Sequence, residues 1–595
     1  MIFILHLCAI SLNFCDPQYM FKKAFGIHAD ASSTDIANAI SKIMDDTSLF
    51  DDYSLFDKPA LSGALTRLAL SDQIYWLPLL YQSLKNSKKV TCVDSTYGIL
   101  SVQLANYFNH VTSYHLNNES LSISRSLITK QKLKNVECHL IDKCDDAGQS
   151  DLFVTKNSLT NIKQVEFCNL LDKLNPECKL FILENNPGLF ARLFPWLKTL
   201  FGDCKINYRS LKKYYKKNNI KVNSFFSIGS TNILNQPVPE FYRSDFNIGD
   251  DCPRRLKSYI GRYVRKAQMA FGITDGFAIT SNGYNTVSLD EESKIKINYP
   301  DRMIMGNGNT SILIAEHNGK KVIIRFSTNP SKSLWRIKNN IHALSYMSST
   351  GLKNHIPFLE EYKLGSSFPF SIETACDGCN LDDITNKLLR EKYIVNSYRF
   401  YYAEQKKRLV EQRLNDNDFE EIVSGRLVRL RKYLKNDDLV ILDDVLEKLK
   451  NLMFGMEHFI SFSHGDYKTG NILYDTENDR FYFIDWDMFM EKSFILVDII
   501  VLYIYKKSEE ESVHLQVAFK DILDNYQSIA GLSECIKYVE RDLGLTKAHI
   551  VSYMIIAWLY SLDLRVATAA YNNKLAYENL ITKAFSYIIQ ELDAA

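Results

Sequence analysis

The sequence predicts two folded domains of different class, an α/β domain followed by an α+β domain. First, its 595 residues exceed what one hydrophobic core usually supports. Second, short apolar runs alternate with helix-length stretches between positions 88 and 280, which is typical of a parallel sheet with crossover helices. Third, a new pattern begins at Arg302, where two β-type runs flank His317-Asn318-Gly319, a hairpin signal, and helical spacing dominates after Tyr393.

The composition indicates an ordinary globular protein, with 46% hydrophobic and 24% charged residues. A net charge of +1 gives no basis for a nucleic-acid partner. Twelve cysteines without paired spacing favour reduced thiols and a cytoplasmic location. The apolar segment 2–14 lacks the preceding basic residues of a signal peptide, which favours a buried first helix or a wrongly assigned start. The apolar segment 550–562 is too short to span a bilayer, so it predicts a core helix.

Three regions are predicted before residue 301: a helical lead-in, an α/β domain and a linker. Residues 1–85 show helical apolar spacing and form a helical lead-in. Residues 86–282 form the α/β domain, whose expected strands are 90–93, 111–114, 136–140, 152–155, 179–183 and a last strand at 277–280. Residues 283–300 are polar, contain Asn-Gly and have no sustained period, so we expect a linker there.

Residues 464–487 contain the groups that phosphoryl transfer to a hydroxyl needs. Asp466 can accept the hydroxyl proton, and Lys468 and Asn471 follow two and five residues later. Segments 472–474 and 482–484 can pair as strands, which would bring Asp485 beside Asn471. An amide oxygen and a carboxylate would then converge, as a hard cation prefers. The competing interpretation is two unrelated polar turns.

The motif His464-Gly465-Asp466, with Asn471 and then Ile484-Asp485-Trp486-Asp487, resembles the aminoglycoside phosphotransferase and choline kinase family, relatives of the protein kinases. The resemblance implies a two-lobed protein kinase-like fold for residues 301–595, with an N-lobe at about 301–376 and a C-lobe at about 377–595. It also implies ATP and Mg²⁺ as cofactors. The roles that it implies are a catalytic base at Asp466, a phosphate contact at Lys468, magnesium ligands at Asn471 and Asp485, and help with a second metal from Asp487.

The same resemblance implies a nucleotide site upstream. Gly306 and Gly308 lie in a turn that either covers the ATP phosphates or is an ordinary hairpin turn. Arg325 ends the second β-type run, where the family usually has a phosphate-binding lysine. The family pairs that cation with a glutamate on the next helix, here 334–346. Asn340 stands at the matching place, and no acid occurs between Phe326 and Leu359. The cation therefore lacks its usual partner.

Residues 370–381 are similar to the hinge strand of this family and the start of its next helix. A hinge of this kind offers backbone groups to adenine, here near Glu373 and Ala375. Cys376 and Cys379 form a CxxC pair, but no second pair completes a zinc site, so the resemblance makes both cysteines incidental. Asp498 matches a structural aspartate of the family, which we expect to support the scaffold.

Residues 88–280 resemble class I S-adenosylmethionine-dependent methyltransferases of the bacterial polysaccharide-biosynthesis type. The resemblance rests on strand order, on Glu184-Asn185-Asn186 within 181–189, and on a helix start at 208–211. A working cofactor site needs glycines after the first strand and an acid at the end of the second. Only Gly98 remains of those glycines, and His115 replaces the acid. This favours a degenerate, structural domain that does not bind S-adenosylmethionine over an active one, with Glu184–Asn186 a candidate substrate contact.

Three functions remain open. The first is an ATP- and magnesium-dependent phosphotransferase acting on a hydroxyl of a small molecule, sugar or glycan end. The second is a bifunctional methyltransferase-kinase that modifies a surface glycan, and the third is a catalytically weak pseudoenzyme acting as a binding scaffold. The intact Asp466, Asn471 and Asp485 favour the first. We expect the acceptor to bind within 382–460 and 500–590, where Tyr398, Tyr401, Tyr402 and the basic residues 406–408 fit a core-plus-solvent helix better than a ligand site.

Overall fold

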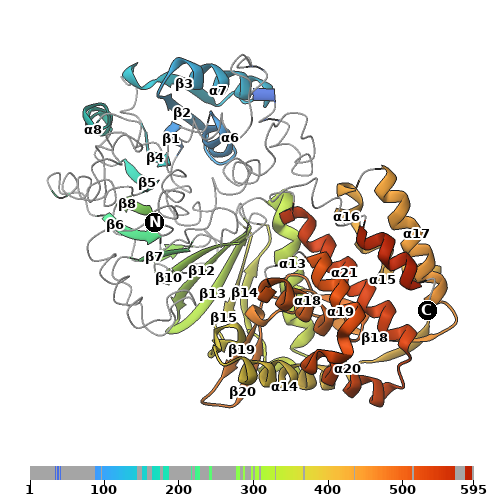
Figure 1. The fold of residues 1–595 in the computed structure, drawn as a ribbon. Helices are drawn as coiled ribbons and strands as arrows, with labels where there is room; N and C mark the ends of the chain where they lie inside the picture. The colour runs from blue at the N-terminus through green and yellow to red at the C-terminus, as the bar shows by residue number, and fades with distance from the viewer. Residues whose placement is uncertain are drawn as a thin grey trace, which may run out of the picture. The chain divides into compact units, whose positions relative to one another are not determined.

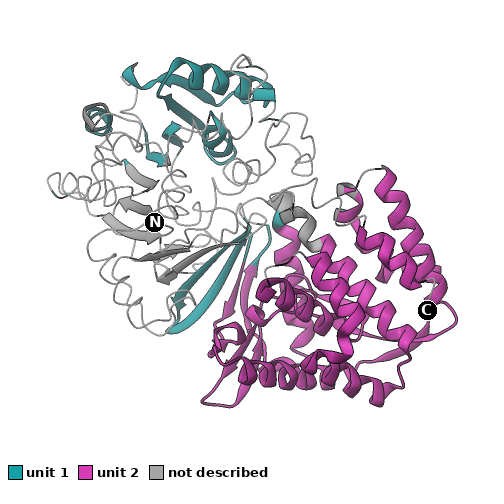
Figure 2. Ribbon diagram, viewed as in Figure 1, with its two compact units in different colours: residues 1–333, 363–370 teal, residues 334–362, 371–595 magenta. Residues whose placement is uncertain are grey.

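The computed structural model divides the chain into two compact units, residues 1–333 with 363–370 and residues 334–362 with 371–595 (Figure 2). The predicted lead-in, residues 1–85, falls almost wholly outside the described residues. Those residues are 34, 37, 38, 41, 88–94, 97–143, 150–156, 164–174, 178–185, 216, 222–227, 240–243, 276–281, 286–288, 296–298, 302–306, 310–327, 330–365, 369–434, 436–511, 513, 515–569 and 583–592.

The first unit contains a parallel sheet with the strand order β3-β2-β1-β4-β5 (Figure 1). All five predicted parallel strands are confirmed, and β1 is buried from its second residue onward, as expected for a sheet covered on both faces. The strands are β1 (Lys89–Asp94), β2 (His110–His115), β3 (Val136–Leu140), β4 (Leu152–Lys156) and β5 (Lys179–Asn185), and the helices between them are α6 (Ile99–Leu104), α7 (Asn118–Lys130) and α8 (Gln164–Lys173).

Beyond β5 the sheet continues with antiparallel strands. The predicted last strand is confirmed as β8 (Gly276–Ser281), which lies between β5 and β6 (Val222–Ser227). Next come β7 (Glu240–Arg243) and β11 (Arg302–Gly306), so the α/β part and the first strand after the predicted linker share one sheet.

The predicted linker, 283–300, contains two short paired strands, β9 (Thr286–Ser288) and β10 (Lys296–Asn298). Each has only three residues, too few for an alternating pattern to be recognised in the sequence. The domain boundary itself stays a prediction.

The predicted hairpin around Asn318-Gly319 is confirmed. It consists of β12 (Thr310–His317) and β13 (Lys320–Ser327), paired over their whole length. Asn318 and Gly319 both have positive φ values, 52° and 73°, as a type I′ turn between two strands requires.

The second unit combines a long helix, short sheets and a helical bundle (Figure 1). It begins within α13 (Pro330–Met347), which is followed by the neighbouring strands β14 (Leu359–Lys363) and β15 (Phe370–Thr374). One three-stranded sheet contains β16 (Cys379–Asn380), β19 (Ile472–Asp475) and β20 (Arg480–Phe483), and another contains β17 (Val410–Arg413), β18 (Glu457–Ser463) and β21 (Met490–Phe494).

The helices of the second unit bury most of its apolar side chains. The predicted core helix is confirmed as part of α21 (Lys547–Ala569), in which Trp558 is fully buried and stacks on Phe519 with 4.9 Å between ring centroids. Among the described residues, no helix is long and apolar enough to cross a membrane. The other helices are α14 (Lys387–Lys406), α15 (Asp416–Ile422), α16 (Val428–Tyr433), α17 (Asn436–Met453), α18 (Val497–Glu511), α19 (Leu515–Asn525) and α20 (Ala530–Leu543).

Helix α14 has the predicted core-plus-solvent character. Its three tyrosines, Tyr398, Tyr401 and Tyr402, are buried. The basic residues that follow lie on the surface, where Lys406 pairs with Asp542 at 2.6 Å. These residues therefore stabilise the helix without requiring a ligand.

Candidate active site

A hairpin brings the two predicted cation ligands together. Strands β19 and β20 pair antiparallel, with Ile472 opposite Phe483. The backbone N–H of Ile484 then donates to the carbonyl oxygen of Asn471 at 3.0 Å. Asn471 directly precedes β19 and Asp485 follows Ile484, so the hairpin places them side by side as the sequence predicts.

Asp466 lies at the centre of this site and is largely buried. Lys468 Nζ contacts Asp466 Oδ2 at 2.5 Å. The side-chain nitrogen of Asn471 donates to the carbonyl oxygen of Asp466 at 2.9 Å and to its carboxylate at 3.2 Å. Because both amide hydrogens of Asn471 are thus directed at Asp466, its Oδ1 remains for a cation, and no donor among the described residues contacts that oxygen.

The donor set suits Mg²⁺, which usually takes one or two protein ligands and completes its shell with substrate phosphates and water. In the described ranges, no three His, Cys, Asp or Glu side chains form a metal site of their own. A cation here would therefore depend on Asn471, Asp485 and phosphate oxygens together.

The charge balance keeps Lys468 protonated. Burial disfavours its charged form, but the negative charges of Asp466 and Asp485 outweigh burial and raise the pKa of Lys468 above its usual range. The ammonium therefore persists at neutral pH, beside the carboxylate that the sequence predicts to be the base.

Two residues of the site have left-handed backbone conformations. Gly465 has a φ of 78°, and a Cβ atom there would lie 2.0 Å from the carbonyl oxygen of Met488. We call residues 464–471 the catalytic loop. Only a glycine at position 465 allows this loop to lie so close to the loop after β20. Asp485 has a φ of 68°, which is uncommon for a residue with a side chain and must be held by its surroundings.

Asp498 holds the start of the catalytic loop. Its carboxylate accepts hydrogen bonds from Ser463 Oγ at 2.7 Å and from Tyr401 Oη at 2.9 Å. It also accepts the backbone N–H groups of His464 at 2.9 Å and Gly465 at 3.1 Å. The sequence indicated a scaffold role for Asp498, which this geometry supports, but it did not reveal the contribution of Tyr401.

His464 connects the catalytic loop to the loop after β20. Its Nε2 donates to the carbonyl oxygen of Ile484 at 3.0 Å, and its ring lies 4.4 Å from that of Trp486 between centroids. Burial lowers the pKa of His464, so the imidazole is neutral at physiological pH.

Asp487, predicted to help a second metal, contacts a residue that sequence reasoning missed. Its carboxylate pairs with Arg336 of helix α13, with Nη1 and Oδ2 3.1 Å apart. Asn339 of the same helix donates to the backbone carbonyl oxygen of Asp487 at 2.9 Å. The spacing of three residues between Arg336 and Asn339 indicates that both lie on one polar face of a helix. It does not indicate that this face contacts Asp487.

The predicted nucleotide-binding residues lie in both units. Gly306 ends β11 and Arg325 is half-buried in β13, both in the first unit, whereas Gly308 lies outside the described residues. Glu373 is buried in β15 and Ala375 follows it, in the second unit with the catalytic loop. Gly306 pairs with Thr310 where β11 and β12 lie antiparallel.

The CxxC pair follows β15, a strand at the position of the predicted hinge. Burial raises the pKa of Cys376 to about 12, so this thiol stays protonated. The Cys379 thiol donates to the carbonyl oxygen of Tyr474 at 3.6 Å. A protonated, largely buried thiol such as Cys376 is typical of a structural cysteine, whereas Cys379 is exposed.

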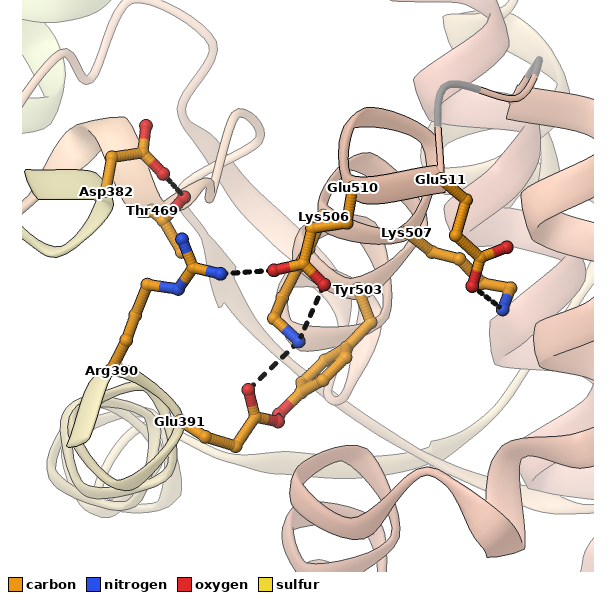
Figure 3. A network of polar contacts seen from close by, with 9 residues as sticks. All are labelled: Asp382, Arg390, Glu391, Thr469, Tyr503, Lys506, Lys507, Glu510 and Glu511. Atoms are coloured by element: carbon orange, nitrogen blue, oxygen red, sulfur yellow. Dashed lines mark hydrogen bonds and ion pairs between the residues drawn. The ribbon is translucent and has the colours of Figure 1, made fainter. Parts of the chain in front are cut away.

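A network of charged side chains clamps α14 to α18 close to the catalytic loop (Figure 3). Lys506 lies 3.0 Å from Glu391 and 3.7 Å from Glu510, and Arg390 pairs with Glu510. Beside these contacts, Thr469 of the catalytic loop donates to Asp382 (Figure 3). Each of these cations is paired with an acid of the network, which stabilises the packing of α14 against α18 beside the site.

In the first unit, a polar network occupies the end of β1 and β2. Ser101 Oγ donates to Asp94 Oδ2 and lies 2.6 Å from Ser113 Oγ, which is 3.0 Å from His115 Nε2. His115 Nδ1 is in turn 3.1 Å from Ser120 Oγ. Burial lowers the pKa of His115 to about 4, so the histidine is neutral and hydrogen-bonded within the domain.

The retained Gly98 has a packing role. It has a φ of 93°, and a Cβ atom there would lie 2.5 Å from Ser124 Oγ of helix α7. The close approach of the chain to α7 therefore accounts for this glycine without a cofactor. Glu184 and Asn185 end β5, whereas Asn186 lies outside the described residues.

Comparison with known proteins adds a family for the second unit. A model described as "phosphotransferase enzyme family" matches residues 401–532, and no curated protein sequence matches the chain. A solved thermostable mutant of aminoglycoside phosphotransferase APH(4)-Ia, in a ternary complex with AMP-PNP and hygromycin B, is 12% identical over 48% of this chain and 91% of its own, with a TM-score of 0.34.

Two further solved structures concern the first unit or most of the chain. A SAM-dependent methyltransferase from Aquifex aeolicus is 16% identical over 32% of this chain and 91% of its own, with a TM-score of 0.22. WbdD, solved with the kinase inhibitor LY294002, is 10% identical over 83% of this chain and 87% of its own, with a TM-score of 0.24. Residues 401–532 are thus similar to the phosphotransferase enzyme family, and the carboxy-terminal part of the chain has a kinase-like fold.

Proposed function

We propose that the chain is an ATP- and magnesium-dependent phosphotransferase whose acceptor is a hydroxyl of a small molecule, sugar or glycan end. The observation that carries this proposal is the convergence of Asp466, Lys468 and Asn471 in one loop, next to the segment that contains Asp485. The family model over 401–532 supports the same reaction class.

The residues of the loop divide the work between them. Asp466 accepts the proton of the acceptor hydroxyl, and Lys468, which contacts that carboxylate, offers a positive charge to the transferred phosphoryl group. Asn471 fixes the Asp466 side chain through its amide nitrogen. Mg²⁺ held by Asn471 and Asp485, with Asp487 as a candidate for a second ion, would neutralise charge on the phosphates. Within the second unit, the backbone near Glu373 and Ala375 would contact adenine. The phosphate contacts expected at Gly306, Gly308 and Arg325 stay predictions.

ATP binding and turnover test this proposal. We expect ATP to raise the unfolding temperature of the full chain only when Mg²⁺ is present, and Asp485→Ala to remove that shift. Asp466→Asn should keep the shift but lower kcat by about 10²- to 10⁴-fold, because it removes the general base. Asp479→Asn, in the turn between β19 and β20, is the matched control and should change neither quantity. A parent protein without any ATP-dependent shift would contradict the proposal.

For the first unit we propose a class I methyltransferase-like fold that does not bind S-adenosylmethionine. The parallel order 3-2-1-4-5 supports the fold, since it is that of doubly wound nucleotide-binding sheets. The buried network from Asp94 to His115 supports the absence of binding, because it replaces the acid that would hold a ribose. Calorimetry with S-adenosylmethionine should detect no heat, and a micromolar Kd, about −8 kcal/mol, would contradict this assignment and favour the bifunctional alternative.

A further inference from the structure

Helix α13 contacts the segment 487–491, which begins two residues after Asp485, through three side chains on one face. Arg336 pairs with the Asp487 carboxylate at 3.1 Å. Asn339 donates to the backbone carbonyl oxygens of Asp487 and Phe489 at 2.9 and 3.0 Å. His342 Nε2 lies 2.5 Å from the Glu491 carboxylate. The spacing of three residues places all three side chains over the same segment.

The three contacts differ in how far they are removed from water. The side chains of Arg336 and Asp487 are 21% and 12% exposed, whereas those of His342 and Glu491 are 52% and 51% exposed. An ion pair between exposed groups contributes little, but removal of one partner from a largely buried pair leaves an uncompensated charge. Arg336 and Asp487 therefore form the strong contact of the three.

Helix α13 contains no acidic residue, so the glutamate that the resemblance implies on this helix is absent. Asn340, at the position where the family has a glutamate, is fully buried, and no hydrogen-bond partner for either polar atom of its amide lies in the described part of the chain. The helix thus contributes a cation, Arg336, to a pair with Asp487, whereas the resemblance implies an acid on this helix that pairs with Arg325.

We propose that Arg336 is a positioning residue for phosphoryl transfer. Its ion pair with Asp487, together with the Asn339 bonds to the backbone, fixes the segment after β20 and so holds Asp485 in its left-handed conformation next to Asn471. This inference rests on the proposed function and assigns Asp487 to the helix contact rather than to a second metal.

Charge exchange separates these two roles of Asp487. Arg336→Ala and Arg336→Asp should lower kcat by about 10- to 100-fold, the cost of a small displacement of reacting groups, with a smaller change in KM for ATP. The double variant Arg336→Asp with Asp487→Arg should regain at least about tenfold of kcat over Arg336→Asp, because the ion pair re-forms with its charges exchanged. If Asp487 is a metal ligand, the double variant cannot recover, and that result would overturn the inference.

A matched control comes from the same region of the chain. Lys492→Ala removes an ion pair with Glu421 in which both side chains are 52% exposed. We expect this variant to leave kcat unchanged. Arg336→Lys, which keeps the charge, should retain more activity than Arg336→Ala, and equal losses in the two would count against the ion pair.

Backbone amide exchange in the full chain tests the anchor without any turnover. Arg336→Ala should speed hydrogen exchange in residues 484–492 by about tenfold, since local opening becomes easier by that factor. Exchange in helix α20 (Ala530–Leu543) should not change, which shows that the variant is folded. Unchanged exchange in 484–492 would refute the anchor. If the parent protein turns over no ATP, the proposed function fails, but this measurement still decides whether Arg336 holds the segment.

Discussion

At the scale of single residues, the site depends on backbone conformations that few side chains permit. Gly465 and Asp485 both have positive φ values, and they lie on the two loops that meet at the site. At Gly465 the missing side chain is itself the requirement, because the Met488 carbonyl oxygen occupies the space that a Cβ atom would take. The spacing of the motif predicted which residues converge, but it carried no information on this contact, which depends on how the two loops pack.

Gly465→Ala should therefore cost more than its φ alone explains. A left-handed alanine costs about 1–2 kcal/mol of stability, and contact with a backbone oxygen at 2.0 Å adds a displacement of the catalytic loop. We expect a loss of both stability and kcat. Gly544→Ala is the control, because Gly544 has a similar φ of 69° but no atom within 4 Å of a Cβ. Urea unfolding and ATP turnover of both variants measure the difference, and equal losses would contradict the role of Met488.

At the scale of elements, helices α13 and α18 fix the catalytic loop and the loop after β20 from outside. Asp498 in the first turn of α18 binds the catalytic loop, and Arg336 of α13 binds the segment after Asp485. The family resemblance implied a helix at 334–346, within α13, and two short apolar runs predicted the β19–β20 hairpin. It could not predict the contact between Arg336 and Asp487, because those residues are 151 positions apart and helical periodicity reports only on neighbours along one element.

Asp498→Asn should uncouple α18 from the catalytic loop. An amide in place of the carboxylate turns one acceptor into a donor, which then faces the donors of His464, Gly465, Ser463 or Tyr401. A buried unsatisfied donor costs about 1–3 kcal/mol, so we expect a lower free energy of unfolding together with a lower kcat. Asp521→Asn, which removes an ion pair to Lys507 at a side chain 41% exposed, serves as control. A variant at Asp498 that is no less stable than this control would refute the scaffold role.

At the scale of the whole molecule, buried neutral histidines occur in both units. Burial lowers the pKa of His115 in the first unit and of His458 in the second to about 4. His458 Nε2 donates to the carbonyl oxygen of Met453 at 2.8 Å, so the neutral ring is built into the packing of β18. The sequence does not distinguish such histidines from exposed ones, because burial is a property of the assembled fold and not of the local pattern.

The stability of the chain should consequently fall as the pH falls from about 6.5 to about 4. In this window an unfolded histidine binds a proton that the folded one does not, which costs up to about 1.4 kcal/mol per pH unit for each histidine. Above pH 6.5 these groups add no pH dependence. Urea unfolding at pH 7 and pH 5 measures the slope, and His458→Gln should reduce it. An unchanged slope in that variant would show that His458 titrates alike in both states.

The pairing of strands from distant parts of the chain was the hardest feature to predict. The order of apolar runs and helix-length stretches separated an α/β part from a later α+β part. The individual strands β1 to β5 and β8 were found where expected. The pairing of β11 with β7, however, joins strands that the sequence assigns to different domains. Strand pairing over such distances is set by sheet packing and not by local preference, so the sequence alone could not predict that β7 and β11 are neighbours.

The β19–β20 hairpin has a consequence for how the candidate cation site forms. Asn471 and Asp485 flank one local hairpin, so a short chain segment closes the site. The entropy lost on closing a loop rises with its length, and a hairpin forms within microseconds in isolation. We therefore expect Asn471 and Asp485 to meet early in folding and at little entropic cost, and Arg336 and Asp498 to make their contacts only after distant helices have packed. Assembly of the ligand pair thus precedes the contacts that make it rigid.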